Sequence, residues 1–323
     1  MLRGRLAALT VVLLLVACST PDEVEPSSNA PTRSASPSAA ASAEASLGSS
    51  TIRPAPSATP EPAATLIAAG DIAACDMEGD SATAALVADL EGTVATLGDH
   101  VYPAGSDETF AECYDPAWGS LRDRTRPAVG NHDLSGDGGA AYFRYFGDGA
   151  GVPGEGWYSY DIGDWHIVAL NSNCELIACT PGSAQYEWLV DDLAAASVQC
   201  TLAYMHHPRF SSGPHGDYPP VAPLWDALHA AEADVVLVGH DHLYERFAPQ
   251  APAGAAHPNG IRQFTVGTGG YQLYGAERVA PNSEVLIDDA LGVLELTLQP
   301  ESYDWRFLTV DGAEPDAGSG ACH

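Results

Sequence analysis

Five short apolar segments of this chain each lead into side chains that can bind a metal ion. Each segment predicts a buried strand, and in four of them a glycine follows and lets the backbone turn sharply. The segments and the residues after them are Thr65–Ala69 with Gly70-Asp71, Thr93–Leu97 with Gly98-Asp99, Pro127–Val129 with Gly130-Asn131-His132-Asp133, Thr201–Met205 with His206-His207-Pro208, and Val235–Val238 with Gly239-His240-Asp241-His242. Because α/β sheets usually build their sites at the carboxyl ends of strands, we expect these side chains to meet at one edge.

The last of these loops carries two imidazoles two positions apart, His240 and His242. Histidine is the commonest metal ligand near neutral pH, and this spacing lets both rings point into one small volume. A phenol, Tyr102, follows Asp99 by three residues. The combination of carboxylate, amide, phenol and imidazole donors predicts a metal centre.

The order of these motifs resembles that of the calcineurin-like metallophosphoesterases, and within them it is most similar to the purple acid phosphatases. Many members of the wider family carry Asp-x-His in the first motif, but the third position here is Ala73. The purple acid phosphatases also lack that histidine and use a tyrosine of the second motif, which Tyr102 matches. The run 240–246, His-Asp-His-Leu-Tyr-Glu-Arg, is similar to their His-x-His-x-Tyr-Glu-Arg. The resemblance spans roughly residues 64–323, which we expect to be one catalytic domain.

The resemblance implies an α/β fold, an αββα sandwich of two mixed β-sheets flanked by helices. The residue pattern agrees with this. Helical spacing of apolar residues predicts helices over Ser81–Leu90, Ser183–Ala196 and Val221–Ala231, and alternation predicts a hairpin of Trp157–Asp161 and Trp165–Asn171. The C-terminal third is rich in strand patterns, at Gln263–Val266, Val293–Leu298 and Tyr303–Val310.

The resemblance also implies two ligand sets that share one carboxylate. The first set comprises Asp71, Asp99, Tyr102 and His242, and the second comprises Asp99, Asn131, His206 and His240. Asp99 would bridge two ions, since a carboxylate has two oxygens with lone pairs in several directions. A phenolate favours a trivalent ion, which the resemblance implies is Fe(III). The second ion would be divalent, and the ligands suit Zn, Fe or Mn equally.

Such a pair of ions would support hydrolysis of phosphomonoesters by direct attack of metal-bound hydroxide on phosphorus. The leaving ester oxygen needs a proton, and the resemblance implies that His132, beside Asn131, or His215, nine residues after His206, supplies it. His207, the residue after the ligand His206, is predicted to face away from the ions, because neighbours on an extended strand point in opposite directions.

Other polar residues of the motifs have structural interpretations. We expect His100 to support the site without touching the substrate, and Asp133 to hydrogen-bond the loop behind the ligands. The run Gly267–Gly270 lacks the lysine and spacing of a phosphate-binding P-loop and predicts a tight turn that lines the cleft. Four more of the 11 histidines are expected on the surface or as satisfied core residues, namely His166, His229, His257 and His323.

The N-terminus predicts export. Arg3 and Arg5 precede an apolar run from Leu6 to Ala17, which is typical of a signal peptide, here residues 1–17. The run ends in Leu-Val-Ala-Cys, which resembles a bacterial lipobox and predicts lipidation of Cys18, with an ordinary secretory signal as the alternative. Residues 18–63 are dominated by Ser, Ala, Pro and Thr and predict a disordered tether. We therefore expect a domain outside the cytoplasm, anchored to the membrane by lipid.

Six cysteines remain when Cys18 is set aside, and an even number in an exported protein suggests disulfides. They allow 15 pairings. Proximity favours Cys174 with Cys179, while Cys75 with Cys113 would join two loops near the first motifs and Cys200 with Cys322 would fix the C-terminus. A cysteine metal site is less favoured because no Cys-x-x-Cys pair occurs.

The charge is strongly acidic, with 43 Asp and Glu against 13 basic residues, all of them Arg. Such a surface repels nucleic-acid backbones, so we expect no nucleic-acid partner and a small phosphate ester as substrate. The alternatives are a phosphodiesterase or nucleotidase with the same site, and a non-catalytic surface protein that binds a phosphorylated ligand. The sequence does not fix the oligomeric state.

Overall fold

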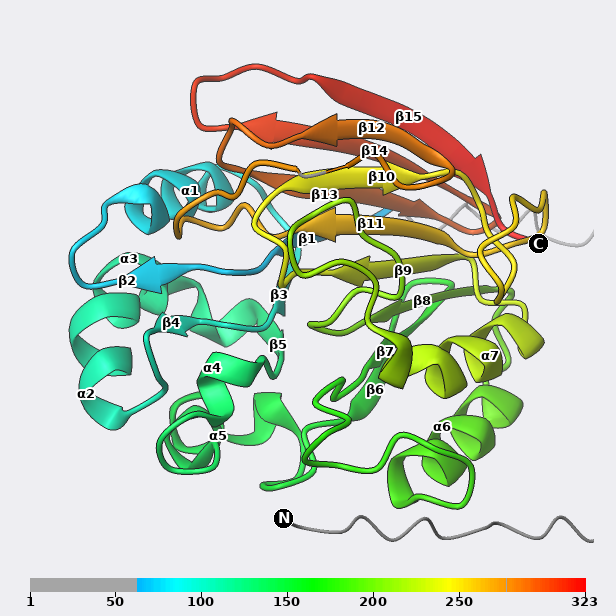
Figure 1. Cartoon of the computed structure of the whole chain (residues 1–323), viewed down its shortest axis with the longest axis horizontal. Helices are drawn as coiled ribbons and strands as arrows, with labels where there is room; N and C mark the ends of the chain where they lie inside the picture. Colours follow the sequence, from blue (N-terminus) through cyan, green and yellow to red (C-terminus); the bar gives the residue numbers. More distant parts are fainter. Residues whose placement is uncertain (1–62, 277) are drawn as a thin grey trace, which may run out of the picture. The chain divides into compact units, whose positions relative to one another are not determined.

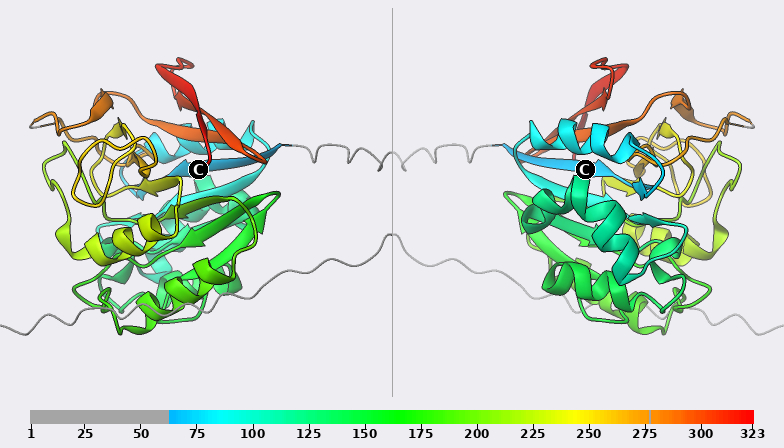
Figure 2. Two further views of the ribbon diagram at one scale, coloured as in Figure 1. Left: turned by 90° about the vertical axis from the view of Figure 1, so that its right-hand side faces the viewer. Right: turned by 90° about the vertical axis from the view of Figure 1, so that its left-hand side faces the viewer.

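In the computed structural model, which describes residues 63–276 and 278–323, two β-sheets pack face to face between helices (Figure 1 and Figure 2). One sheet has the strand order β15-β14-β13-β1-β3-β5 and the other the order β12-β10-β11-β9-β8-β7-β6. A short pair, β2 with β4, lies apart from them. Both large sheets contain parallel and antiparallel neighbours, which confirms the predicted αββα sandwich of two mixed sheets.

The strands of the first sheet and the short pair are β1 (Ala64–Ala69), β3 (Thr93–Leu97), β5 (Thr125–Ala128), β13 (Gly292–Gln299), β14 (Ser302–Thr309), β15 (Asp316–Ala321), β2 (Ala73–Ala74) and β4 (Val101–Tyr102). The strands of the second sheet are β6 (Tyr158–Ile162), β7 (Trp165–Ala169), β8 (Cys200–Tyr204), β9 (Val235–Val238), β10 (Tyr244–Phe247), β11 (Arg262–Val266) and β12 (Ser283–Ile287). The predicted strands and hairpin are present, with ends shifted by at most two residues.

The helices are α1 (Gly79–Ala88), α2 (Asp107–Thr109), α3 (Asp115–Trp118), α4 (Asn131–Leu134), α5 (Ala140–Phe146), α6 (Ala184–Ala195) and α7 (Ala222–Ala230). The three predicted helices correspond to α1, α6 and α7. Figure 1 shows α6 and α7 together on one side of the molecule, with α1 to α5 on the other side. None of the helices in the described part of the chain is long and apolar enough to cross a membrane.

Alternation along the strands divides the core into layers. Leu66 and Ala68 of β1 pack between the sheets with Ile167 of β7, while Ile67 and Ala69 face the opposite way. These two join the cluster under α1 and α5, and the outward residues of β7, β8 and β9 pack against α6 and α7. Because successive strand side chains point to opposite faces, each buried strand serves two layers. The sequence accordingly shows continuous apolar runs.

The three suggested disulfides are confirmed: Cys75–Cys113, Cys174–Cys179 and Cys200–Cys322. The last joins β8 of one sheet to the residue that follows β15 of the other, 122 positions apart. The predicted signal peptide, residues 1–17, and all but the last residue of the predicted tether, residues 18–63, lie outside the described residues. Those interpretations, and the boundary at residue 64, stay predictions.

Candidate metal centre

Parallel pairing brings the motif loops to one edge. β1, β3 and β5 are parallel neighbours in the first sheet, as are β7, β8 and β9 in the second. Their carboxyl ends therefore deliver the loops to the same region, and backbone hydrogen bonds tie the loops together. Asp71 N–H donates to Gly98 O at 3.1 Å, and Gly239 N–H donates to His206 O at 2.9 Å.

Two glycines of the motifs are needed for close approach. A Cβ at Gly130 would overlap Oδ1 of Asp99, and one at Gly239 would lie 2.6 Å from Oδ2 of Asp71. No side chain larger than hydrogen fits where a carboxylate is already packed. These two positions therefore require glycine because the ligand residues pack against them, in addition to the sharp turn of the backbone.

The first predicted ligand set converges around the Tyr102 hydroxyl. That oxygen lies 2.8 Å from Oδ1 of Asp71, 3.2 Å from Oδ2 of Asp99 and 3.1 Å from Nε2 of His242. Both carboxylates are buried, and Tyr102 is only 5% exposed. We call this group of four residues site A.

The second set converges on the other side of Asp99. Nε2 of His206 lies 3.2 Å from Oδ2 of Asp99, 3.0 Å from Oδ1 of Asn131 and 3.2 Å from Nδ1 of His240. We call this group site B. All seven predicted ligands thus meet in one place, with Asp99 shared by the two sites.

The donor atoms fit a pair of metal ions. Donor atoms that share one ion, each about 2.0–2.2 Å from it, lie roughly 3 Å from one another, as the donors of both sites do. His206 donates its Nδ1 hydrogen to Leu97 O at 2.8 Å, and His242 donates its own to Gln272 O at 2.6 Å. Since those carbonyls can only accept, the Nε2 lone pair of each ring faces the site. No arginine in the described part of the chain pairs with Asp71 or Asp99, and the chain has no lysine.

Opposite charges stabilise one another within the two sites. Burial alone would raise the pKa of Asp71 and of Asp99, but the imidazoles of His242 and His206 hold both below the ordinary value. Burial opposes protonation of His206, yet the carboxylate of Asp99 raises its pKa to about 9. Burial and the two carboxylates raise the pKa of Tyr102. A cation bound here would displace protons from His206 and Tyr102.

Three ligands have backbones in the left-handed region. Asp71, Asp99 and His240 have φ values of 61°, 52° and 72°. Such a conformation costs on the order of 1–3 kcal/mol per residue and persists only where the surroundings impose it. Only five non-glycine residues of the described chain have a positive φ, and three of them are ligands. This concentration indicates that the fold imposes the backbone conformation of the site.

Asp133 and His100 lie behind the ligands, as predicted. Asp133 is buried and accepts hydrogen bonds from the backbone N–H groups of Asp99, His100 and Gly130, and from Nδ1 of His100. The other nitrogen of His100, Nε2, lies 2.7 Å from the Thr96 hydroxyl. His100 is therefore structural, and Asp133 fixes the loop that carries Asp99.

The two expected proton donors flank the centre. His132 donates from Nδ1 to Pro103 O at 2.7 Å, which leaves Nε2 4.0 Å from Oδ2 of Asp99. His215 is exposed and its ring lies 4.4 Å from the ring of His240. The loop of His215 is held by Asp241, which accepts from the His215 backbone N–H and from the Ser211 hydroxyl. The sequence pattern predicted no role for Asp241, although this residue lies between the ligands His240 and His242.

The prediction that His207 faces away from the ions is wrong. Strand β8 ends at Tyr204, so alternation along an extended strand does not reach this residue. The ring of His207 lies 4.5 Å from that of His240 and 4.9 Å from that of His206. The structure thus places a further imidazole beside site B.

Other residues at the centre were also missed. Tyr271 stacks on Tyr102 with ring centroids 3.8 Å apart, and Tyr274 stacks on His242 at 4.0 Å. Both follow the predicted turn 267–270, whose Gly269 donates its N–H to Gly70 O beside site A. The pattern Gly-Gly-Tyr-x-x-Tyr was the available signal. His166, by contrast, is a satisfied core residue as expected, bonded to Asp161 and Asp192.

Residues 64–244 match the calcineurin-like phosphoesterase family, and the chain belongs to that family. Among curated proteins it is similar to two from Arabidopsis thaliana. It is 27% identical over 174 residues to probable purple acid phosphatase 20, covering 46% of this chain and 40% of that protein, and 26% identical over 222 residues to purple acid phosphatase 23, covering 60% and 48%. The chain thus spans about half the length, or less, of these relatives.

Solved structures show the same fold. Purple acid phosphatase PPD1 from yellow lupin seeds has a TM-score of 0.70 at 18% identity, covering 82% of this chain and 55% of that one. GAP50, described as the anchor in the inner membrane complex of Plasmodium, has a TM-score of 0.64 at 17% identity, covering 81% and 90%. The fold is therefore shared by proteins with different descriptions, and the side chains of the site must decide the activity.

Proposed function

We propose that this chain hydrolyses phosphomonoesters at a centre of two metal ions held by sites A and B. The observation that carries the proposal is the convergence of two buried carboxylates, a phenol and three imidazoles at donor spacings of about 3 Å. The likeness to purple acid phosphatases supports the same chemistry, as does the imidazole orientation at His206 and His242. Two bound ions would clamp a phosphate group and lower the pKa of a water molecule, which supplies the hydroxide that attacks phosphorus.

The residues of the chain then have separate tasks. Tyr102 favours a trivalent ion, Fe(III), in site A, while the amide and imidazoles of site B suit Zn, Fe or Mn. In the reaction the oxygen of one water joins phosphorus and the ester P–O bond breaks. The departing oxygen takes a proton from His132 or His215, which flank the centre. The products are an alcohol and inorganic phosphate.

Rates on paired substrates test the activity. The full-length chain, supplied with iron, zinc and manganese, should hydrolyse 4-nitrophenyl phosphate faster than bis(4-nitrophenyl) phosphate. A preference for the diester would reassign the protein as a phosphodiesterase with the same site. Turnover of neither substrate would make a phosphate-binding role the better account.

Two variants test the ligand assignment. Asn131→Ala and His206→Ala each remove a donor of site B, so both should lose the divalent ion and nearly all turnover. Circular dichroism should show that the fold persists, because neither side chain belongs to the apolar core clusters. Normal turnover in both variants would contradict the assignment.

We also propose that the domain is exported and anchored through lipid on Cys18. The support is the charged and apolar N-terminus that ends in Leu-Val-Ala-Cys, together with three disulfides, which form in oxidising compartments. Mass spectrometry of the protein from its membrane fraction should find acyl groups on an N-terminal Cys18. A mature chain that starts elsewhere, without lipid, would contradict the anchor.

A further inference from the structure

One buried imidazole beside site B belongs to neither ligand set. His207 is 5% exposed, and its ring stacks on Tyr218 with centroids 4.4 Å apart. One of its ring nitrogens lies within 4.8 Å of the donor nitrogens of His206 and His240, close enough for three imidazoles to hold one ion. Whether His207 can be a ligand depends on which of its nitrogens carries the hydrogen.

Hydrogen-bond accounting at Ser172 answers that question. The Ser172 hydroxyl oxygen accepts from the backbone N–H of His207 at 2.8 Å and lies 2.9 Å from Nδ1 of the same histidine. Ser172 is fully buried, and within residues 63–276 and 278–323 its hydroxyl hydrogen has no other acceptor. Since an unsatisfied buried donor costs about 1–3 kcal/mol, the hydroxyl donates to Nδ1. The hydrogen of the neutral ring must then be on Nε2.

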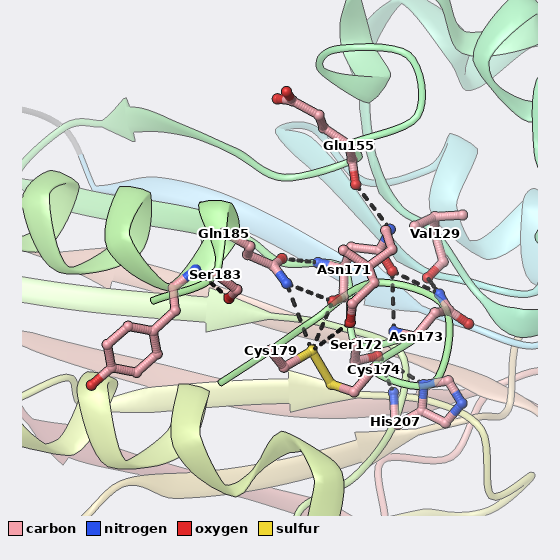
Figure 3. The surroundings of a disulfide bond; sticks show 12 residues. Val129, Glu155, Asn171, Ser172, Asn173, Cys174, Cys179, Ser183, Gln185 and His207 are labelled. Carbon is pink, nitrogen blue, oxygen red and sulfur yellow. Dashed lines mark hydrogen bonds between the residues drawn. A yellow bond between two sulfur atoms is a disulfide. The ribbon is translucent and has the colours of Figure 1, made fainter. Parts of the chain in front are cut away.

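This arrangement is the reverse of that at the two ligand histidines. His206 and His242 each give the Nδ1 hydrogen to a backbone carbonyl, which leaves Nε2 as an electron-pair donor. In His207, Nδ1 accepts and Nε2 is an N–H donor. Figure 3 shows Nε2 on the side of the ring away from Ser172, and no hydrogen-bond partner for it occurs in the described part of the chain. In the neutral ring His207 therefore carries a hydrogen, and no lone pair, on the nitrogen that points away from Ser172.

The loop that sets this orientation is itself held rigidly (Figure 3). It follows β7, which is parallel to β8, so its polar residues reach the same edge as the metal motifs. Asn171 exchanges two hydrogen bonds with Gln185 of α6, and Asn173 donates to Val129 O at 3.2 Å. The Cys174–Cys179 disulfide closes the segment that follows. Ser172 is thus fixed from both sides.

We propose that His207 is a substrate-binding residue whose Nε2–H donates to an oxygen of the phosphate group bound at site B, and that it is not a metal ligand. This inference rests on the proposed function, since it needs a phosphate at the metal pair. The donor is held in position before the phosphate arrives, because the His207 ring contacts both Ser172 and Tyr218. Ser172 is a positioning residue that acts through His207.

The first test reads the position of the hydrogen directly. Nitrogen-15 NMR of the zinc-loaded, full-length chain with labelled histidine distinguishes a ring protonated on Nε2 from one protonated on Nδ1. The resonance that disappears in His207→Gln should have the shifts of a neutral ring with hydrogen on Nε2. Shifts of a zinc-bound ring, or of a ring with hydrogen on Nδ1, would overturn the proposal.

The second test separates phosphate binding from metal binding. In His207→Asn the amide is too short to reach the position of Nε2, and inorganic phosphate should bind about tenfold or more weakly, as loss of a hydrogen bond to a charged group implies. Zinc content should stay at the wild-type value. His207→Gln places an amide N–H near the position of Nε2 and should recover much of the affinity. His257→Asn, which changes an exposed histidine, is the control and should match wild type.

The outcomes are distinct. Loss of zinc in His207→Asn would show that His207 is a ligand, and unchanged phosphate affinity would show that it makes no contact; either overturns the proposal alone. A wild-type chain that binds neither zinc nor phosphate would overturn the proposed function and this inference together.

Discussion

At the scale of single residues, the centre depends on a carboxylate, Asp133, that is not one of the predicted ligands. Asp133 accepts four hydrogen bonds from the loops that carry Asp99 and Asn131, and it is completely buried. These bonds balance the strain of the left-handed backbone at Asp99. The position of a ligand is therefore set by a neighbour that contributes nothing to the donor set.

Asp133→Asn tests this dependence. An amide can accept only on its oxygen and places an NH₂ group against backbone N–H donors, so we expect a loss of about 3 kcal/mol or more in the free energy of unfolding. Urea denaturation measures it, and metal content should fall in parallel. The control is Asp123→Asn, which changes an exposed carboxylate and should leave the free energy of unfolding unchanged. Equal stability of the two variants would show that Asp133 is dispensable.

At the scale of elements, His166 links the edge strand β6 to helix α6. Its Nδ1 lies 2.9 Å from Asp161 of the strand and its Nε2 lies 2.9 Å from Asp192 of the helix. The hydrogen bond to Asp192 raises the pKa of His166, burial opposes it, and Asp161 adds to the rise. Because the folded state raises the pKa, the stabilisation is complete below the unfolded value of about 6.5 and is lost as pH rises through the folded value.

His166→Asn should therefore lower the free energy of unfolding more at acid pH than at alkaline pH. We expect the variant to lose about 1 kcal/mol relative to wild type at pH 6, after allowance for solvent screening, and less at pH 9. The midpoint of urea unfolding at the two pH values measures the difference. A loss that is the same at both pH values would show that the charge of His166 plays no part.

The elements also show what sequence could and could not predict. β1, β3, β8 and β9 were predictable because each is a short apolar run followed by a turn residue or a polar ligand. The loop of Ser172 follows the same pattern after β7, but its Asn-Ser-Asn contains no histidine or carboxylate. The roles of Ser172 and Asp241 depend on hydrogen bonds to residues 26 to 35 positions away, which local patterns do not contain. The prediction for His207 was wrong because β8 ends at Tyr204, before strand alternation could reach this residue, and because the ring is held by the distant Ser172.

At the scale of the whole molecule, the two sheets are joined covalently as well as by their shared core. The Cys200–Cys322 disulfide closes a loop of 122 positions, whereas Cys174–Cys179 closes a loop of five. A longer loop removes more conformational entropy from the unfolded chain. The Cys200–Cys322 disulfide should therefore contribute most to the free energy of unfolding.

Paired removal tests this difference. By the chain-entropy relation, replacing both Cys200 and Cys322 with Ala should lower the free energy of unfolding by about 5 kcal/mol, and replacing Cys174 and Cys179 by about 2 kcal/mol. Thermal and urea unfolding of the two double variants against wild type give the comparison. An equal or reversed order would indicate that local packing outweighs loop length.

The central claim is that the fold brings seven residues together to hold two metal ions, with Asp99 shared between them. The most direct measurement is the number of ions per chain, by elemental mass spectrometry, after loading the full-length protein with iron and zinc and removing the excess. We predict two ions in wild type and in Asp123→Asn, and clearly fewer in Asp99→Asn, which loses the bridging charge. One ion or none in wild type, or two in Asp99→Asn, would contradict the account.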